Sequence, residues 1–220
     1  MRKVVIFGMG QVAEVMHYYL AEEGGREVVA FTVDGGYRTA DSVLGLPVVD
    51  FEEVERLYPP ETHEMFVAIS FRGVNKLRTA KVAACEAKGY ALASHVSPKA
   101  MVWPGLEVHP NTMIMEANVI QPHVKIGKNV TLWSGNHIGH HSTIEDNCFI
   151  ASHVVVSGAC TVGAGTFIGV NATLRDGISL GVECVVGAGA LVLASAPDFS
   201  VFIGQATPIA KVPSHRLRSI

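Results

Sequence analysis

The chain has 220 residues, of which 49% are hydrophobic and 17% charged, with a formal net charge of −3. This composition fits one large or two small folded domains and excludes a disordered chain. The weakly acidic balance argues against binding of nucleic acid, and no apolar run reaches the roughly 18 residues that a membrane-spanning helix needs. Four cysteines without Cys-x-x-Cys pairing indicate a reducing, cytoplasmic setting.

Residues 1–94 alternate between strand-like and helix-like segments. We expect strands at 3–7, 27–33, 65–70 and 90–93, and helices at 12–23, 52–58 and 74–88. Short buried strands that alternate with amphipathic helices are typical of a parallel sheet covered by helices. The sequence therefore predicts a small Rossmann-like α/β domain over residues 1–94.

A different pattern begins at Val96. Every sixth residue from Val96 to Val192 is Val, Ile or Leu, seventeen positions in all, without a slip in register. A period of six suits neither an α-helix nor one long strand, whose periods are 3.6 and 2. It is typical of a solenoid whose coil consists of three short strands. We therefore expect a parallel β-helix at residues 95–196, closed at one end by the α/β domain and at the other by a capping tail at 197–220.

The same repeat predicts which side chains point inward and which form the corners. Strand alternation turns inward a second set of mostly small residues, two positions before each aliphatic one: Val130, Ser142, Cys148, Val154, Cys160, Thr166, Ala172, Cys184 and Ala190. Glycine fills the first corner position six times, at 127, 139, 163, 169, 181 and 187. Glycine there predicts tight turns, and the inward cysteines are expected to be structural.

Residues 18 apart occupy the same corner on successive coils, about 4.8 Å from each other. His140 is therefore expected one coil from Gly158, with its imidazole beside an exposed backbone N–H. A proton acceptor next to an oxyanion donor is typical of an acyl-transfer site. His141 lies at the same corner and remains a rival for the role of base.

Other interpretations of these histidines stay open. They fit a solvated corner or an interface in an oligomer equally well, and a non-catalytic solenoid is one alternative function. His137, His140 and His141 are close in sequence, which keeps a metal-dependent hydratase-type enzyme as another alternative. Their side chains leave from a strand and from a turn and do not converge, so we expect no metal.

The turn after the first predicted strand carries a second signal. Gly8-Met9-Gly10-Gln11-Val12-Ala13 has the pattern Gly-x-Gly-x-x-Ala between a strand and a helix, where backbone amides can hold a phosphate. Asp34 follows Gly10 by 24 residues, at a place where an acidic side chain can hold a ribose hydroxyl. The domain is too short for a full dinucleotide fold, so Gly8, Gly10 and Asp34 predict a mononucleotide site.

These segments together resemble a known family. Ile-Gly-His-His-Ser-Thr-Ile-Glu-Asp-Asn at 138–147 and Val-Ser-Gly-Ala-Cys-Thr-Val-Gly at 156–163 resemble the left-handed β-helix acyltransferases. The turn at 4–13 and Phe-Thr-Val-Asp at 31–34 resemble the N-terminal domain of the sialic-acid O-acetyltransferase-like branch. Bacillosamine and perosamine N-acetyltransferases of bacterial glycan synthesis belong to that branch. The segment 203–212 is similar to the family's closing Gly-Asn-Pro-Ala-Lys motif.

The resemblance implies an overall reaction and an assembly. It implies a left-handed β-helix that forms a homotrimer, with sites between adjacent prisms. Acetyl-CoA would be the acyl donor, and a nucleotide-linked amino sugar, held partly by the N-terminal domain, would be the acceptor. Transfer to nitrogen or to oxygen stays open.

The resemblance also assigns roles to residues at the predicted corner. The family's base falls on His140, and the glycine whose amide faces the thioester oxygen falls on Gly158. His141 stands where the family usually has the acidic residue that orients the base. Trp133 stands where the family often has a polar residue, so nearby Asn136 is expected to contact the acceptor.

The coenzyme groove is expected on coils after the predicted oxyanion donor. The corner positions Gly169 and Gly187, together with Gly158, are the residues expected to line it.

Overall fold

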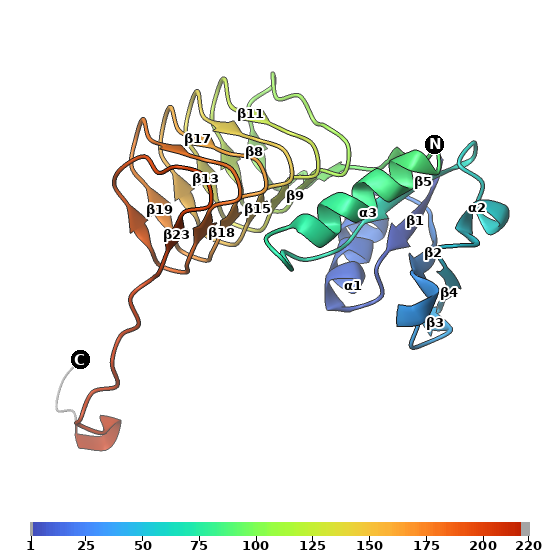
Figure 1. The fold of residues 1–220 in the computed structure, drawn as a ribbon, viewed down its shortest axis with the longest axis horizontal. Coiled ribbons are helices and arrows are strands. Elements are labelled where there is room, and N and C mark those ends of the chain that lie inside the picture. The colour runs from blue at the N-terminus through green and yellow to red at the C-terminus, as the bar shows by residue number, and fades with distance from the viewer. Residues whose placement is uncertain (1, 217–220) are drawn as a thin grey trace.

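A computed structural model describes residues 2–216 of the chain. It has an α/β half at the N-terminus and a coil of stacked strands that extends away from it (Figure 1). Within the described residues, no helix is long and apolar enough to cross a lipid bilayer.

The α/β half forms a mostly parallel sheet with strand order β3-β4-β2-β1-β5-β6. Its elements are β1 (Lys3–Phe7), α1 (Gln11–His17), a π-helical turn (Tyr18–Glu23), β2 (Val28–Val33), a 3-10 turn (Gly35–Tyr37), β3 (Ser42–Val43), β4 (Leu46–Asp50), α2 (Val54–Leu57), β5 (His63–Val67), α3 (Lys76–Ala87) and β6 (Ala91–Leu92). Met16 of α1 and Leu20 of the π-helical turn pack on one face of this sheet. Val82 and Cys85 of α3 pack on the other face. All seven segments expected from the sequence are present as strands or helices.

Two strands of this sheet were missed. β3 and β4 form a hairpin, and β4 then pairs in parallel with β2 at the sheet edge. Pro47 lies inside β4, and proline normally argues against a strand because it lacks the N–H that a ladder needs. Pro47 is tolerated because only β3 pairs with that part of β4, while β2 pairs with Val48–Asp50, so the local sequence offers little sign of these strands.

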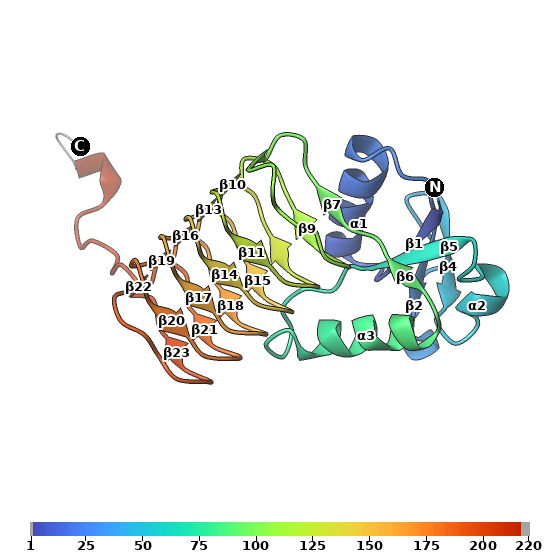
Figure 2. The same ribbon diagram turned by 90° about the horizontal axis from the view of Figure 1, so that it is seen from above.

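The coil consists of two-residue strands stacked into three parallel sheets (Figure 2). The first sheet contains β8 (Met101–Val102), β10 (Val119–Ile120), β13 (His137–Ile138), β16 (Val155–Val156), β19 (Thr173–Leu174) and β22 (Leu191–Val192). The second contains β11 (Lys125–Ile126), β14 (Thr143–Ile144), β17 (Thr161–Val162) and β20 (Ser179–Leu180). The third contains β7 (His95–Val96), β9 (Met113–Ile114), β12 (Thr131–Leu132), β15 (Phe149–Ile150), β18 (Phe167–Ile168), β21 (Val185–Val186) and β23 (Val201–Phe202). Partners in each sheet inside the repeat are 18 residues apart, for example His137 with Val155.

The six-residue period is confirmed at sixteen of its seventeen positions, each of which is the second residue of a strand. Val108 is the exception. It belongs to no strand and is 44% exposed, and Leu106 packs against the core nearby. The loop between β8 and β9 therefore bulges out of the first coil, and the second sheet begins one coil later than the first.

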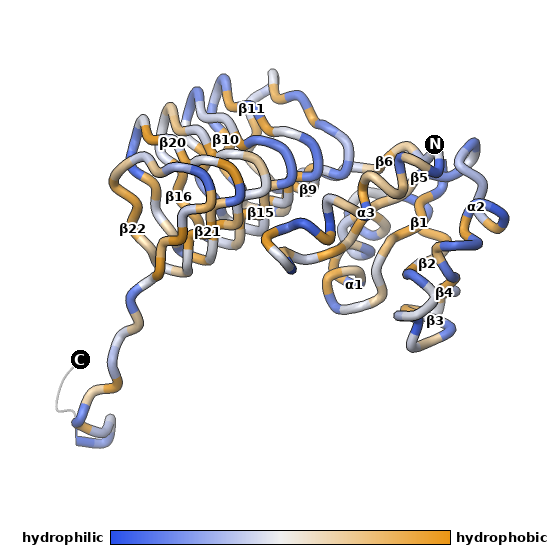
Figure 3. The backbone as a smooth tube through the Cα atoms, viewed as in Figure 1, coloured by the Kyte–Doolittle hydropathy of each residue, from blue (hydrophilic) through white to orange (hydrophobic). Residues whose placement is uncertain are grey.

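The interior of the coil matches the predicted inward positions. The aliphatic residues and the second set of small residues form one continuous buried cluster, and hydrophobic colour recurs along the stacked strands (Figure 3). Cys148, Cys160 and Cys184 are each at most 1% exposed within it. Burial of each apolar side chain contributes about 1.5–3 kcal/mol, so this cluster dominates the stability of the coil.

The explanation that the sequence suggested for the corner glycines is wrong. The six first-corner glycines do not have positive φ angles. Left-handed backbone occurs two positions later, every six residues from Asn111 to Gly189, and includes His141 with φ 58°. A Cβ on Gly163 would lie 2.4 Å from the carbonyl carbon of Gly181, so glycine is needed there because successive coils approach closely.

The two halves are joined by a buried polar contact surface. Arg78 of α3 is 1% exposed and donates to the Thr131 hydroxyl at 2.6 Å and to the carbonyls of Asn147 and Cys148. The Asn75 side chain donates to two further carbonyls of the coil. These contacts fix the α/β half against the third sheet.

The C-terminal segment differs from the expected cap. β23 adds a strand to the third sheet, but the chain then extends away from the coil (Figure 1). Ile203 and Ile209 are 86% and 98% exposed. Gly204 still lies against the last coil, but residues 206–216 do not cover the open end within one chain, and residues 217–220 of the expected tail lie outside the described residues.

Candidate active site

The candidate site lies at the corner between the first and second sheets. We call this the histidine corner and define it as residues 121–124, 139–142, 157–160 and 175–178 on successive coils. Because the repeat is regular, His140 and Gly158 lie one above the other. The His140 ring covers Gly158 so closely that a Cβ there would lie 2.7 Å from Cε1 and 2.8 Å from Nε2. The predicted juxtaposition of an imidazole with this glycine is present.

The two adjacent histidines contact each other. Nδ1 of His140 lies 3.2 Å from Nδ1 of His141, with the ring planes nearly perpendicular at 83°. The His141 ring packs against His123 in a tilted arrangement with a centroid distance of 4.6 Å, and the centroid of His123 in turn lies 5.4 Å from that of Trp103. His140 therefore contacts the end of a column of aromatic rings through His141.

The amide of Gly158 is occupied, which corrects the expectation of an exposed N–H. It donates to the Asp176 carboxylate at 2.9 Å. Asp176 lies 18 residues after Gly158, so the same spacing that paired His140 with Gly158 could have found it. Gln121 is a second missed residue, and its side-chain oxygen accepts the His140 N–H at 2.8 Å. Acidic and amide side chains that cap corner N–H groups are a general feature of this coil.

A cavity opens beside the histidine corner where the loop before β9 leaves the first coil. It has a volume of about 340 Å³ and is lined by Trp103, Glu107, His109, His123 and Lys125 among others. The bulge that displaces Val108 therefore creates a recess next to the stacked histidines. The sequence repeat gave no sign of it, because the hexad pattern continues unbroken through this loop.

Asn136 is not a surface residue. It is 1% exposed and lies in the coil interior, where its amide donates to the Trp133 carbonyl and its oxygen accepts the Val154 N–H at 2.8 Å. Both functional groups of the side chain are used inside the protein. The expectation that it contacts the acceptor is therefore wrong, because position 136 is one of the inward positions of the repeat.

Gly169 and Gly187 lie at a different corner, between the third and first sheets. A Cβ on Gly169 would meet the Ala188 N at 2.7 Å, and one on Gly187 the Gly204 N at 2.9 Å. Contact between coils explains why these positions are glycine. Their part in a coenzyme groove stays a prediction.

The N-terminal candidates gather at the carboxyl edge of the parallel sheet. Gly8 follows β1 with φ 127°, and a Cβ there would lie 2.9 Å from the Ala68 carbonyl oxygen, so only glycine fits. Gly10 precedes α1 with open space around it. Asp34 follows β2, the neighbour of β1, and pairs with Lys81 at 2.6 Å. The structure places Gly8, Gly10 and Asp34 at one edge, in the half of the chain that does not contain His140.

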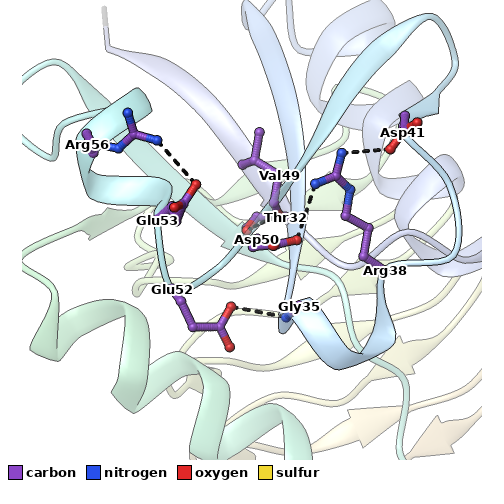
Figure 4. A network of polar contacts seen from close by, with 9 residues as sticks. All are labelled: Thr32, Gly35, Arg38, Asp41, Val49, Asp50, Glu52, Glu53 and Arg56. Atoms are coloured by element: carbon purple, nitrogen blue, oxygen red, sulfur yellow. Dashed lines mark hydrogen bonds and ion pairs between the residues drawn. The ribbon is translucent and has the colours of Figure 1, made fainter.

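The loop after Asp34 is held by a polar network (Figure 4). Glu52 accepts the Gly35 N–H at 3.0 Å, while Arg38 pairs with Asp41 and Asp50. Hydrogen bonds from the backbone N–H groups of Glu52 itself and of Gly35 lower the pKa of the Glu52 carboxyl. The network fixes the course of the chain beside Asp34.

Metal and thiol chemistry find no support among the described residues. Residues 2–216 contain no group of three or more His, Cys, Asp or Glu side chains placed to hold a metal ion. Burial raises the pKa of the Cys148 thiol to about 12, and burial likewise raises the pKa of Cys160. These thiols face the coil interior and do not offer a thiolate nucleophile.

Comparison with known proteins gives two family matches in the coil. Residues 123–158 match the bacterial transferase hexapeptide (six repeats), and residues 160–194 match the hexapeptide repeat of succinyl-transferase. No curated protein matches the chain.

Solved structures match over nearly the whole chain. PerB from Caulobacter crescentus, in complex with CoA and GDP-perosamine, is 28% identical, with a TM-score of 0.83 over 93% of this chain and 95% of that one. The acetyltransferase domain of PglB from Neisseria gonorrhoeae is 25% identical, with a TM-score of 0.79 over 90% and 94%. WeeI from Acinetobacter baumannii shares the fold at 17% identity, with a TM-score of 0.75 over 93% and 97%.

The hexapeptide families and the corner imidazole together define a class. The chain is a β-helix acyltransferase of the hexapeptide-repeat type. The likeness to PerB and PglB extends through both halves of the chain. The chain therefore has the architecture of a β-helix acetyltransferase, and it is similar to perosamine N-acetyltransferase and to the PglB acetyltransferase domain along nearly its whole length.

Proposed function

We propose that this protein transfers an acetyl group from acetyl-CoA to the amino group of a nucleotide-linked sugar. The observation that carries the proposal is the His140 imidazole lying directly over Gly158 at the histidine corner. The structures of PerB hold CoA and GDP-perosamine, which supports this pair of substrates. A sugar hydroxyl is the second candidate acceptor, because a neutral imidazole can accept a proton from either group.

The reaction is a direct acyl transfer. The acceptor nitrogen attacks the thioester carbonyl carbon, and Nε2 of His140 takes the proton that the nitrogen loses. The carbon–sulfur bond then breaks, and the coenzyme leaves as a thiolate that recovers a proton from the imidazolium. The buried cysteines are not used, so no acyl-enzyme forms. The main contributions of the protein are orientation of two bound substrates and a correctly placed base.

The oxyanion of the tetrahedral intermediate needs a donor. We assign this role to the Gly158 N–H, which becomes available when Asp176 releases it on binding of acetyl-CoA. Asp176 is a side chain on the next coil and can rotate away without any change in the backbone. Removal of one preorganised oxyanion donor typically costs about 3–4 kcal/mol of transition-state stabilisation.

The N-terminal half is assigned to the nucleotide. Its parallel strands resemble the first part of a Rossmann fold, and Gly8, Gly10 and Asp34 lie together at the carboxyl edge, where such sheets bind ligands. We propose that residues 1–94 hold the nucleotide, that 95–196 carry the chemistry, and that the protein works as a cytoplasmic homotrimer. In that assembly the acceptor reaches a histidine corner at the boundary between two chains.

The experiment is a substrate panel. Purified protein is mixed with acetyl-CoA and each of several nucleotide-linked 3- and 4-amino sugars, and free thiol is followed with a chromogenic disulfide. Release that depends on one amino sugar, with N-acetylated product found by mass spectrometry, supports the proposal. O-acetylated product selects the second acceptor, and no thiol release with any member favours the non-catalytic solenoid.

A further inference from the structure

The two corner histidines, His140 and His141, can form a hydrogen bond only if one of their two facing nitrogens carries a proton and the other does not. Nδ1 of His140 and Nδ1 of His141 are 3.2 Å apart, which is hydrogen-bond distance. Neutral imidazole carries a proton on one nitrogen and a lone pair on the other. One ring must therefore donate and the other accept, so the tautomer of each histidine fixes that of its neighbour.

The His141 ring is held in place by groups outside the pair. Its backbone is left-handed with φ 58°, and its N–H donates to the Pro122 carbonyl at 3.2 Å. Its ring packs in a tilted arrangement against His123, which in turn packs against Trp103. The backbone hydrogen bond and the ring contact with His123 restrict rotation of the His141 ring, so its Nδ1 is presented to His140.

Only one of the two tautomer arrangements leaves a base at the reaction centre. The Nε2 and Cε1 atoms of His140 are the ring atoms nearest Gly158, so Nε2 is the atom that faces the reaction. For Nε2 to have a free lone pair, the proton of His140 must sit on Nδ1 and be donated to His141. His141 then carries its own proton on Nε2. In the opposite arrangement His140 has its lone pair turned toward His141 and cannot act as base.

The charged groups near His140 do not replace the acidic residue that the family usually has where His141 stands. In the part of the chain that the structure describes, the histidine ion-paired with a carboxylate is His95, with Glu23. Asp176 bonds the Gly158 amide. Across the coil, Glu107, His109 and Lys125 line the cavity that His123 also lines.

We propose that His141 is a positioning residue, which accepts the Nδ1 proton of His140 and thereby keeps Nε2 of His140 free as base. The proposal rests on the proposed function and gives a neutral imidazole the part that a carboxylate would otherwise play. A neutral acceptor does not favour the imidazolium as a carboxylate does. Activity should therefore persist to lower pH than in a variant with a carboxylate at this position.

The first test reads the tautomers without any substrate. In protein labelled with ¹⁵N-histidine, two-bond ¹H–¹⁵N correlations at pH 8 should show His140 protonated at Nδ1 and His141 protonated at Nε2. His140→Asn and His141→Asn variants assign the signals. The reversed pattern overturns the positioning role. Because this result is obtained in the absence of turnover, it is independent of whether the substrate panel succeeds.

The second test uses variants at left-handed corner positions. Ala117 and Ala159 occupy such positions in the natural sequence, so His141→Ala is compatible with the backbone. We expect His141→Ala to lower kcat about 10²-fold with the KM for acetyl-CoA nearly unchanged, since a displaced base costs about that much. His141→Asn should recover most of the rate, because its amide oxygen can accept the same proton. His141→Glu should move the acid limb of the kcat profile to higher pH.

His153 is the matched control. It is also an exposed histidine at a left-handed corner position, with φ 59°, and its ring covers Gly135 on a different corner. His153→Ala should leave kcat unchanged. Equal losses in His141→Ala and His153→Ala would show a merely structural effect, and no loss in His141→Ala would remove the positioning role.

Discussion

The two halves of the molecule place their functional residues by different means. In the coil, residues 18 apart are stacked by the repeat itself, which puts His140 over Gly158 and Asp176 beside the Gly158 amide. In the α/β half, Asp34 meets Lys81 across 47 residues through sheet topology and helix packing. In a regular solenoid, the number of residues between two positions therefore predicts whether their side chains are close. In an α/β sheet, the strand order must be known before such a prediction can be made.

The largest expected effect is at the junction of the halves. Arg78→Ala removes hydrogen bonds to Thr131, Asn147 and Cys148 and leaves buried acceptors without a donor. We expect a loss of at least about 3 kcal/mol in the free energy of unfolding, measured by chemical denaturation. Arg72→Ala, at an exposed position in the loop before α3, is the control. A loss below about 1 kcal/mol in Arg78→Ala would show that the halves are not held by this side chain.

The second prediction tests whether the corner glycines are needed because successive coils approach closely or because the chain turns there. In Gly163→Ala the added Cβ would meet the Gly181 backbone at 2.4 Å, so we expect a loss of about 3 kcal/mol in the free energy of unfolding. Gly36→Ala in the α/β half has open space and should change it by less than about 0.5 kcal/mol. Similar small effects in both variants would contradict close approach of the coils.

The third prediction tests the assignment of the nucleotide to the α/β half. Asp34→Asn should raise the KM for the nucleotide sugar about 10-fold, equivalent to roughly 1.4 kcal/mol, and leave the KM for acetyl-CoA unchanged. Asp41→Asn, on the same loop with a carboxylate that is 95% exposed, is the control. An increase in the KM for acetyl-CoA alone would place the coenzyme, and not the sugar nucleotide, at this edge.

The smallest expected effect is on the free energy of unfolding at low pH. It arises from Glu23, where the π-helical turn meets the first coil. Burial alone would raise the pKa of Glu23, but hydrogen bonds from His95, Ser97 and Lys99 outweigh it and lower that pKa. A carboxyl with a lowered folded-state pKa stabilises the fold above its usual value of 4.5 and loses this contribution as the pH falls below it.

Glu23→Gln removes that titration. Between pH 6 and pH 3.5 the wild-type free energy of unfolding should fall about 1 kcal/mol further than that of Glu23→Gln. Glu22→Gln, at an exposed neighbouring position, should follow the wild type. Parallel curves for wild type and Glu23→Gln would show that this carboxyl gains nothing from its partners.

The sequence predicted much of the coil and less of its chemistry. The six-residue period located sixteen strands and the inward set, because each hexad must bury one aliphatic side chain against the next coil. It failed at Val108, where the pattern continues but the chain bulges outward. Nothing local distinguishes this hexad, since the bulge is favoured by packing of Leu106 and Trp103 around it.

Two predictions about the candidate site are wrong, although the spacing of the repeat contains the information needed to correct them. Asn136 was expected to contact the acceptor because it is polar and near the base, yet the repeat itself places position 136 inside the coil. The Gly158 N–H was expected to be exposed, and Asp176 was overlooked although it obeys the spacing of 18. The histidine contact depends on side-chain rotation, which no sequence period encodes.

The central claim is that His140 is the base, and comparison of His140→Asn with the wild type tests it most directly. With acetyl-CoA and the amino-sugar nucleotide that the panel selects, thiol release should fall about 10²–10⁴-fold while the unfolding transition stays unchanged. A rate within about threefold of wild type, together with abolished turnover in His141→Asn, would contradict the account and assign the proton transfer to the neighbouring histidine.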